Sequence, residues 1–139
     1  MKTQLRNFLM GAGLTVLVWG PLLKADEDLA VAKIPFDFQV NQTSLPAGTY
    51  TVIMDSNIVT IRLRNESTGK SILVMAPGRE DPGKSEPRLT FHHYGDHYFL
   101  SGIYTYSNPG YTLRKGSLER EMERGGAAVA MAYVPMENR

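Results

Sequence analysis

The sequence predicts a single antiparallel β-barrel or β-sandwich of about seven strands, with one short helix near the C-terminus. Three observations favour this all-β fold class. Apolar and polar residues alternate over several short runs, which is the period of a half-buried strand. Turn-forming residues separate the runs at short spacing, without a strand–helix–strand rhythm. The chain of 139 residues is long enough for one domain with its own core.

Residues 1–25 have the pattern of a secretory signal peptide. Lys2 and Arg6 precede an uncharged apolar run over Phe8–Leu23, and an acidic stretch follows Ala25. The run of 16 residues is short for a membrane-spanning helix, which needs about 20, so an uncleaved anchor is the alternative. We expect residues 26–139 to form a single exported β domain, periplasmic or secreted, in a Gram-negative bacterium.

Composition excludes several classes of function. The chain has no cysteine, which rules out disulfides, thiolate nucleophiles and cysteine-ligated zinc. Cleavage after Ala25 leaves 12 basic and 14 acidic residues, a net charge of −2, which argues against a nucleic-acid binder. The expected partner is an unknown small molecule or an envelope protein. Contact with the membrane is expected only through the N-terminal segment, if that segment is not cleaved.

The N-terminal half of the domain predicts four strands. Residues 31–40 alternate, and Pro35 places that strand at an edge or a bulge because proline cannot donate to a ladder. Residues 41–48 predict a turn and residues 49–54 the second strand. The third strand, residues 58–64, turns Arg62 and Arg64 outward.

The fourth predicted strand, residues 70–76, lacks clean alternation. This pattern is typical of a strand covered on both faces or placed near the sheet centre. Residues 77–87 contain three prolines and predict a long loop without regular structure.

The next two predicted strands, residues 88–94 and 97–106, flank Gly95-Asp96 and predict a tight hairpin. This register places His92 opposite Phe99 and His93 opposite Tyr98. The more apolar face of the hairpin is expected to point to the core, and it holds Leu89, Phe91, His93, Tyr98, Leu100 and Tyr104.

The C-terminal part begins with a predicted loop over residues 107–116. Residues 117–124 predict the helix, with Ser117 as N-cap, Leu118 and Met122 on its apolar face, and Gly125 in a left-handed C-terminal position. Residues 127–134 predict the closing strand.

The hairpin carries all three histidines of the chain. His92 and His97 share one face as diagonal neighbours and are the candidate metal ligands, whereas His93 points the other way. Open catalytic zinc sites use three protein ligands, and a third ligand would have to come from a carboxylate elsewhere. The alternative is a hairpin with polar decoration and no metal.

Other chemistry is sparse, so we expect neither an enzyme nor a cofactor. No nucleophile elbow and no phosphate-binding glycine loop is present in the sequence. Tyr94, Tyr98 and Tyr104 are candidate ligand-binding residues because tyrosines on a β surface stack on sugars and on protein partners. Arg62 and Arg64 are candidates for an anionic group, and the alternative is a solvated face that discourages aggregation.

The motifs IPFDFQV, LPAGTYTV, FHHYGDHYFL and KGSLEREMER resemble an uncharacterised family of small exported bacterial β-rich proteins. The resemblance covers nearly all of the domain after the leader, and it implies an exported β domain without an assigned activity. The expected function is therefore non-enzymatic: binding of a ligand or a protein, or a structural role in the envelope. The alternative is a metal-binding protein or metal-dependent enzyme that uses His92 and His97.

Overall fold

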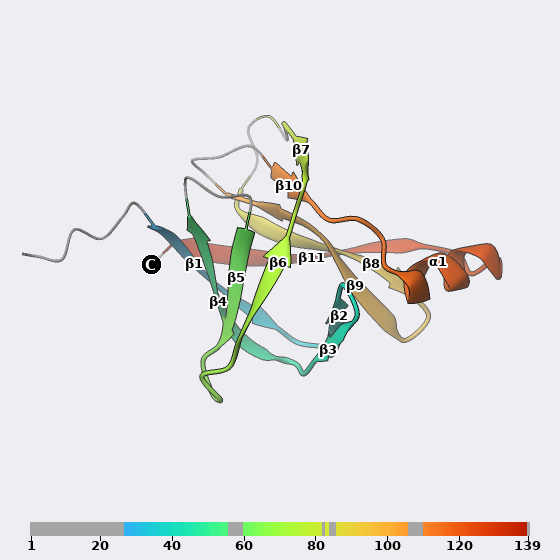
Figure 1. Cartoon of the computed structure of the whole chain (residues 1–139), viewed down its shortest axis with the longest axis horizontal. Coiled ribbons are helices and arrows are strands. Elements are labelled where there is room, and N and C mark those ends of the chain that lie inside the picture. The colour runs from blue at the N-terminus through green and yellow to red at the C-terminus, as the bar shows by residue number, and fades with distance from the viewer. Residues whose placement is uncertain (1–26, 56–59, 82, 84–85, 106–109, 139) are drawn as a thin grey trace, which may run out of the picture.

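The computed structural model describes residues 27–55, 60–81, 83, 86–105 and 110–138, which form a curled, open β-sheet with a helix at one end (Figure 1). The predicted signal peptide lies outside the described residues. Within them, eleven strands follow the order β3-β2-β9-β8-β11-β1-β4-β5-β6, with β10 beside β9 and β7 beside β10. The elements are β1 (Glu27–Ile34), β2 (Phe38–Val40), β3 (Thr43–Leu45), β4 (Gly48–Asp55), β5 (Thr60–Asn65), β6 (Ser71–Met75), β7 (Gly78–Glu80), β8 (Arg88–Tyr94), β9 (His97–Tyr104), β10 (Gly110–Thr112), α1 (Ser117–Arg124) and β11 (Ala130–Asn138).

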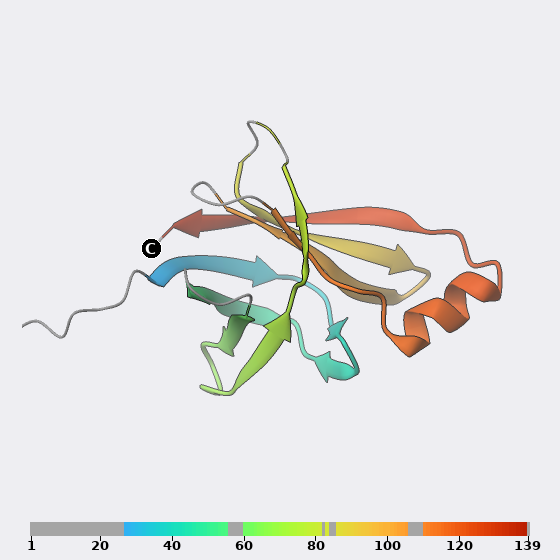
Figure 2. The same ribbon diagram turned by 45° about the horizontal axis from the view of Figure 1, so that its top comes forward.

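The predicted all-β class with a short helix is confirmed, but about seven strands was too few, and the sheet is curled like half a barrel and stays open. β3, β7 and β10 are three residues long and lie in segments that predicted turns or loops. The single strand predicted over residues 31–40 is interrupted at residues 35–37 and becomes β1 and β2. The ladder begins at β3 and ends at β6, so the sheet does not close on itself (Figure 2).

The inside of the curled sheet is filled by its own side chains. Phe38, Tyr50, Leu63 and Phe91 come from four different strands and are each at most 1% exposed. Phe38 meets the rings of Tyr50 and Phe91 edge to face, with centroids 5.3 and 5.5 Å apart. These contacts hold the two halves of the sheet together, because each half contributes the apolar face that the other half covers.

β6 lies at the end of the ladder. The sequence predicted instead that this strand is covered on both faces or lies near the centre of the sheet. It pairs with β5 alone among the strands that the structure describes. Val74 is fully buried, whereas Leu73 and Met75 are 63% and 68% exposed. The apolar run therefore has an ordinary buried face and an apolar face open to solvent.

The hairpin of β8 and β9 has the predicted register around Gly95, which adopts a φ of 57°. A bulge follows, because Thr90 pairs with Gly102 while Phe91 pairs with Leu100. The extra residue moves Tyr104 to the face opposite the core, where it pairs with Arg88. The prediction that Tyr104 faces the core with Leu89 and Phe91 was wrong for this reason.

The helix has the predicted span but different contacts. Gly116 is the N-cap and Ser117 is the first helical residue. The buried residue of the helix is Glu119, at 2% exposure, whereas Leu118 is 39% exposed. Gly126 rather than Gly125 takes the left-handed conformation, with a φ of 82°. Through Glu119, α1 meets a polar partner on the hairpin, His92.

Candidate functional site

The two ends of the ladder, β3 and β6, flank a pocket of about 540 Å³ that we call the seam pocket. Its walls come from β3, from β6, and from β4 and β5 behind them. The lining residues are Thr43, Ser44, Leu45, Pro46, Tyr50, Leu63, Asn65, Thr68, Lys70, Ser71 and Ile72. The volume falls within the range typical of sites for small organic ligands.

The inner wall of the seam pocket is apolar. Leu45 and Ile72 approach from opposite sides as half-buried side chains, and Leu63 lies behind them at 1% exposure. The Tyr50 hydroxyl donates a hydrogen bond of 2.6 Å to the Pro46 carbonyl oxygen. Burial raises the pKa of Tyr50, so its phenol stays a neutral donor at ordinary pH.

The polar rim of the seam pocket is the turn between β5 and β6. The Asn65 side-chain oxygen accepts hydrogen bonds from the backbone N–H groups of Ser67, at 2.8 Å, and Thr68, at 3.1 Å. The Asn65 N–H donates to the Lys70 carbonyl oxygen at 2.8 Å. These bonds fix the turn and place the exposed Lys70 at the rim. A ligand with an apolar body and one anionic group matches this arrangement.

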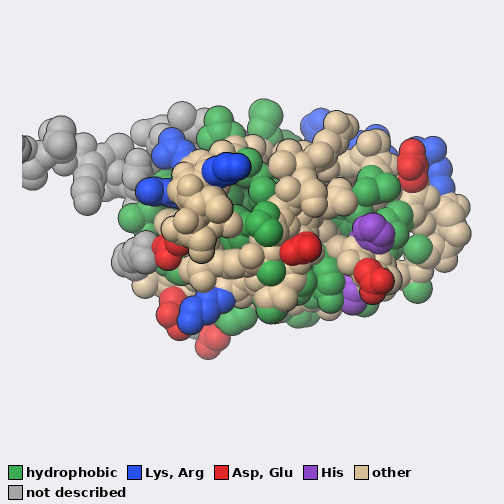
Figure 3. Space-filling view, turned by 90° about the horizontal axis from the view of Figure 1, so that it is seen from below, with side chains coloured by type: hydrophobic (Ala, Val, Ile, Leu, Met, Phe, Trp, Pro, Cys, Tyr) green, Lys and Arg blue, Asp and Glu red, His purple; other side chains and the backbone are tan. Residues whose placement is uncertain are grey.

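The candidate metal ligands lie on one face of the hairpin but in different surroundings. His92 donates from Nδ1 to the buried carboxylate of Glu119, with distances of 3.2 and 3.3 Å to its two oxygens. His97 is exposed and stacks near Phe99, with centroids 6.4 Å apart. Within the described ranges, no three His, Cys, Asp or Glu side chains gather closely enough to hold a metal ion. The histidine side chains visible in Figure 3 are likewise separated from each other.

The three candidate tyrosines do not form one surface. Tyr94 is 1% exposed, and burial raises its pKa, with the Glu119 carboxylate adding to the shift. Tyr98 is stacked between Phe36 and His93, with centroid distances of 3.7 and 3.9 Å. Both rings are therefore engaged in packing within the fold.

Tyr104 is also held on all sides. Its hydroxyl donates to Glu80 Oε2 at 3.0 Å, and the Arg88 guanidinium lies 4.6 Å from its ring centroid. A Cβ atom added to Gly102 would lie 2.8 Å from Tyr104 Cε2. A Cβ atom added to Gly110 would overlap the Tyr104 ring. Burial raises the pKa of Tyr104, and the nearby Glu80 adds to this shift. The ring covers two glycines of neighbouring strands and has a structural role here.

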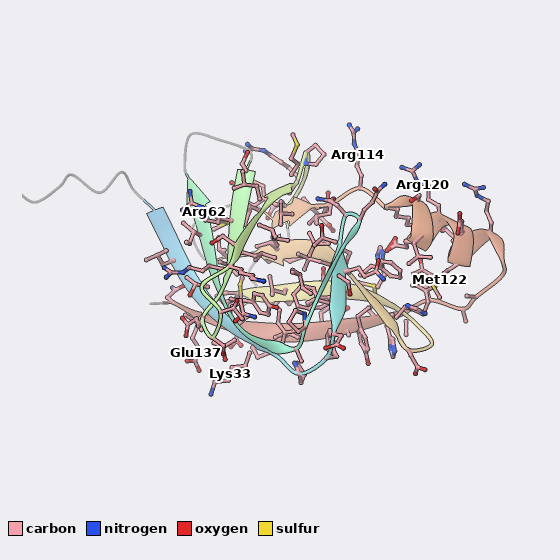
Figure 4. All side chains as sticks on the ribbon, turned by 60° about the horizontal axis from the view of Figure 1, so that its bottom comes forward. Lys33, Arg62, Arg114, Arg120, Met122 and Glu137 are labelled. Carbon is pink, nitrogen blue, oxygen red and sulfur yellow. The ribbon has the colours of Figure 1, made fainter. Side chains whose placement is uncertain are left out.

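Arg62 and Arg64 are exposed on the outer face of β5, as predicted. They lie opposite Leu73 and Ser71 of β6. Figure 4 shows Arg62 at the end of the molecule away from α1 and its Met122. The sequence did not predict the seam pocket. Strand order brings β3 and β6 to the two ends of the ladder, and periodicity gives no information on strand order.

No family model, curated protein or solved structure was found to match this chain. The resemblance to a family of exported β-rich proteins therefore depends on the four sequence motifs alone. Among the described residues, no helix has the length and apolar character needed to cross a membrane.

Proposed function

We propose that this chain is an exported, non-enzymatic binding domain of the cell envelope, and that its ligand occupies the seam pocket. The observation that carries the proposal is a pocket of about 540 Å³, largely apolar inside, at the place where the curled sheet stays open. Export is inferred from the signal-peptide pattern of residues 1–25. The partner class is an envelope protein or a small molecule.

The packed interior favours the seam over a central ligand cavity. A carrier of the closed-barrel type holds its ligand in a hollow interior. Here Phe38, Tyr50 and Phe91 occupy the inside of the sheet. An apolar group that enters the seam pocket meets Leu45, Leu63 and Ile72 without displacing this core. Its burial against these side chains supplies the driving force, at about 25 cal/mol per Å² of apolar surface removed from water.

Two neighbouring residues of β6 provide a matched test. Ile72 lines the seam pocket, whereas Leu73 points to the opposite face. We expect Ile72→Trp to fill the pocket and weaken binding of an apolar anionic fluorescent probe, anilinonaphthalene sulfonate, by about tenfold or more. Leu73→Trp should leave the affinity within about threefold of the unchanged protein. Equal affinities of both variants for the probe would refute the seam pocket as the site.

Native mass spectrometry of the protein purified from its own compartment without chelator complements this test. An organic adduct that is retained by Leu73→Trp and lost from Ile72→Trp would identify the natural ligand of the seam pocket. A clean mass would direct the search to protein partners.

The alternative function is metal binding, or metal-dependent catalysis, at His92 and His97. It is supported by the carboxylate that holds His92 Nδ1, because this arrangement often orients a histidine whose other nitrogen binds a metal. The alternative predicts a transition-metal adduct in the same mass spectrum. The adduct should be lost from the His92→Ala, His97→Ala double variant, and retention of the metal there would reject these ligands.

A further inference from the structure

The free edge of β6 offers a defined set of backbone groups. In an antiparallel pair, hydrogen-bonded and non-hydrogen-bonded residue pairs alternate. The Asn65 N–H donates to the Lys70 carbonyl oxygen at 2.8 Å, which makes this pair hydrogen-bonded. Counting along the register, Ile72 and Val74 bond to β5, so the residues that alternate with them turn their N–H and C=O groups to the free edge. These residues are Ser71, Leu73 and Met75.

Among the residues that the structure describes, this edge lacks the usual protection against pairing with another chain. Sheet edges are commonly protected by charged residues, proline, bulges or very short strands. The opposite edge, β3, has three residues and is followed by Pro46. β6 has five residues, Ser71–Met75, with no charge, proline or glycine. Its Leu73 and Met75 are among the most exposed large apolar side chains of the described residues.

The free edge and the seam pocket are adjacent. Ser71 and Ile72 belong to β6 and also line the pocket, and Thr43–Leu45 of β3 form the wall across from them. An extended chain paired to β6 would therefore lie over the pocket. Its side chains alternate in direction, so every second one would enter the pocket between Leu45 and Ile72, and the others would face outward.

The surroundings of β6 also indicate the charge of such a chain. Arg62 and Arg64 are exposed on β5 beside β6, and Lys70 is exposed at the rim. The ion pairs His92–Glu119 and Lys115–Glu123 of the described residues do not involve these three cations. Outward-facing carboxylates on an added strand would meet this positive surface.

We propose that the free edge of β6 accepts an extended, acidic segment of another protein as an additional strand over the seam pocket. This inference rests on the proposed function and specifies the ligand as a polypeptide. Backbone hydrogen bonds to Ser71, Leu73 and Met75 provide pairing, and alternate apolar side chains fill the pocket. Salt should weaken the association, because exposed ion pairs are screened.

The test uses capped synthetic peptides of about eight residues, one alternating valine with glutamate and one alternating valine with lysine. Fluorescence anisotropy of labelled peptides should show about tenfold tighter binding of the glutamate peptide. Leu73→Pro removes an edge N–H without removing a bond to β5 and should weaken binding by about tenfold. Leu73→Thr keeps the N–H and should bind within about threefold of the unchanged protein. Equal binding of both peptides, or an unaffected Leu73→Pro variant, would overturn the inference.

Hydrogen exchange on the unchanged protein provides a readout that does not depend on any variant folding. The glutamate peptide should slow exchange of the Ser71, Leu73 and Met75 amides. If the fluorescent probe binds in an Ile72-dependent manner but the peptide protects none of these amides, the proposed function stands and the strand inference fails. If neither ligand binds, both fail. Protection of the same amides by self-association without peptide would make the occupant a second copy and overturn the inference.

Discussion

The packing of Tyr104 over Gly110 leads to a prediction whose magnitude follows from the structure. A side chain at Gly110 would overlap the Tyr104 ring, so Gly110→Ala must displace the ring. Overpacking of this kind costs about 1–3 kcal/mol. The displaced ring also loses its hydrogen bond to Glu80 and its contact with Arg88, worth about 1 and 0.5–1 kcal/mol. Together these costs should lower the free energy of unfolding by about 2.5–5 kcal/mol.

A double-mutant cycle isolates the contribution of the ring. In a Tyr104→Ala background, the closest remaining neighbour of the new methyl group is the Glu80 carbonyl oxygen, at 3.0 Å. Gly110→Ala should then cost less than about 1 kcal/mol, which gives a coupling of about 2–4 kcal/mol. For urea unfolding with a slope of about 2 kcal/mol per molar, Gly110→Ala should lower the unfolding midpoint by about 1–2 M more when Tyr104 is present than when it is alanine. An equal cost in both backgrounds would refute the argument that Gly110 exists to accommodate Tyr104.

Two further predictions concern buried titratable groups. His92→Ala leaves the Glu119 carboxylate buried without its partner and should lower the free energy of unfolding by about 2–3 kcal/mol in urea titrations. Glu119→Gln in the same background should recover part of this loss, and no recovery would contradict the pairing. Burial raises the pKa values of Tyr50, Tyr94 and Tyr104 in the folded state, so the unfolded chain loses these protons first. Stability should therefore fall as pH rises above about 10, and phenolate absorbance in which all tyrosines ionise near that pH would contradict this.

The sequence predicted the hairpin register because two independent signals agree there. Gly95-Asp96 supplies the turn, and the flanking runs alternate on both sides of it. The pairing of His92 with Phe99 and of His93 with Tyr98 followed directly and is confirmed. The bulge near Thr90 was not predictable, since it depends on how Gly102 and the strands beside it pack. One inserted residue was enough to move Tyr104 to the other face.

The short strands were missed for a related reason. Thr43–Leu45, Gly78–Glu80 and Gly110–Thr112 lie among prolines and glycines that favour turns. β7 pairs with β10, which is equally short and distant in the sequence, whereas β3 pairs with its neighbour β2 across the turn at Asn41 and Gln42. Three-residue strands depend on tertiary pairing more than on local propensity, so their sequences need not resemble strands.

The helix shows how a polar contact can replace an apolar one. Leu118 and Met122 form the apolar stripe of the helix, yet Glu119 is the residue that is buried. A buried carboxylate requires a hydrogen-bond partner, and His92 on β8 provides it. Helical periodicity identifies apolar stripes and gives no signal for a buried glutamate whose partner lies 27 positions away in the sequence.

The same limit of periodicity bears on β6. Its apolar run predicted a strand covered on both faces, and the structure shows an edge strand with Leu73 and Met75 exposed. Periodicity reports that a strand has two apolar faces, and it does not report whether the second face is covered by the same chain or by another one. Outward apolar side chains on an unprotected edge are a liability in an isolated domain. Their presence next to an open pocket is accounted for when a partner strand covers the edge, and the peptide experiment tests this explanation directly.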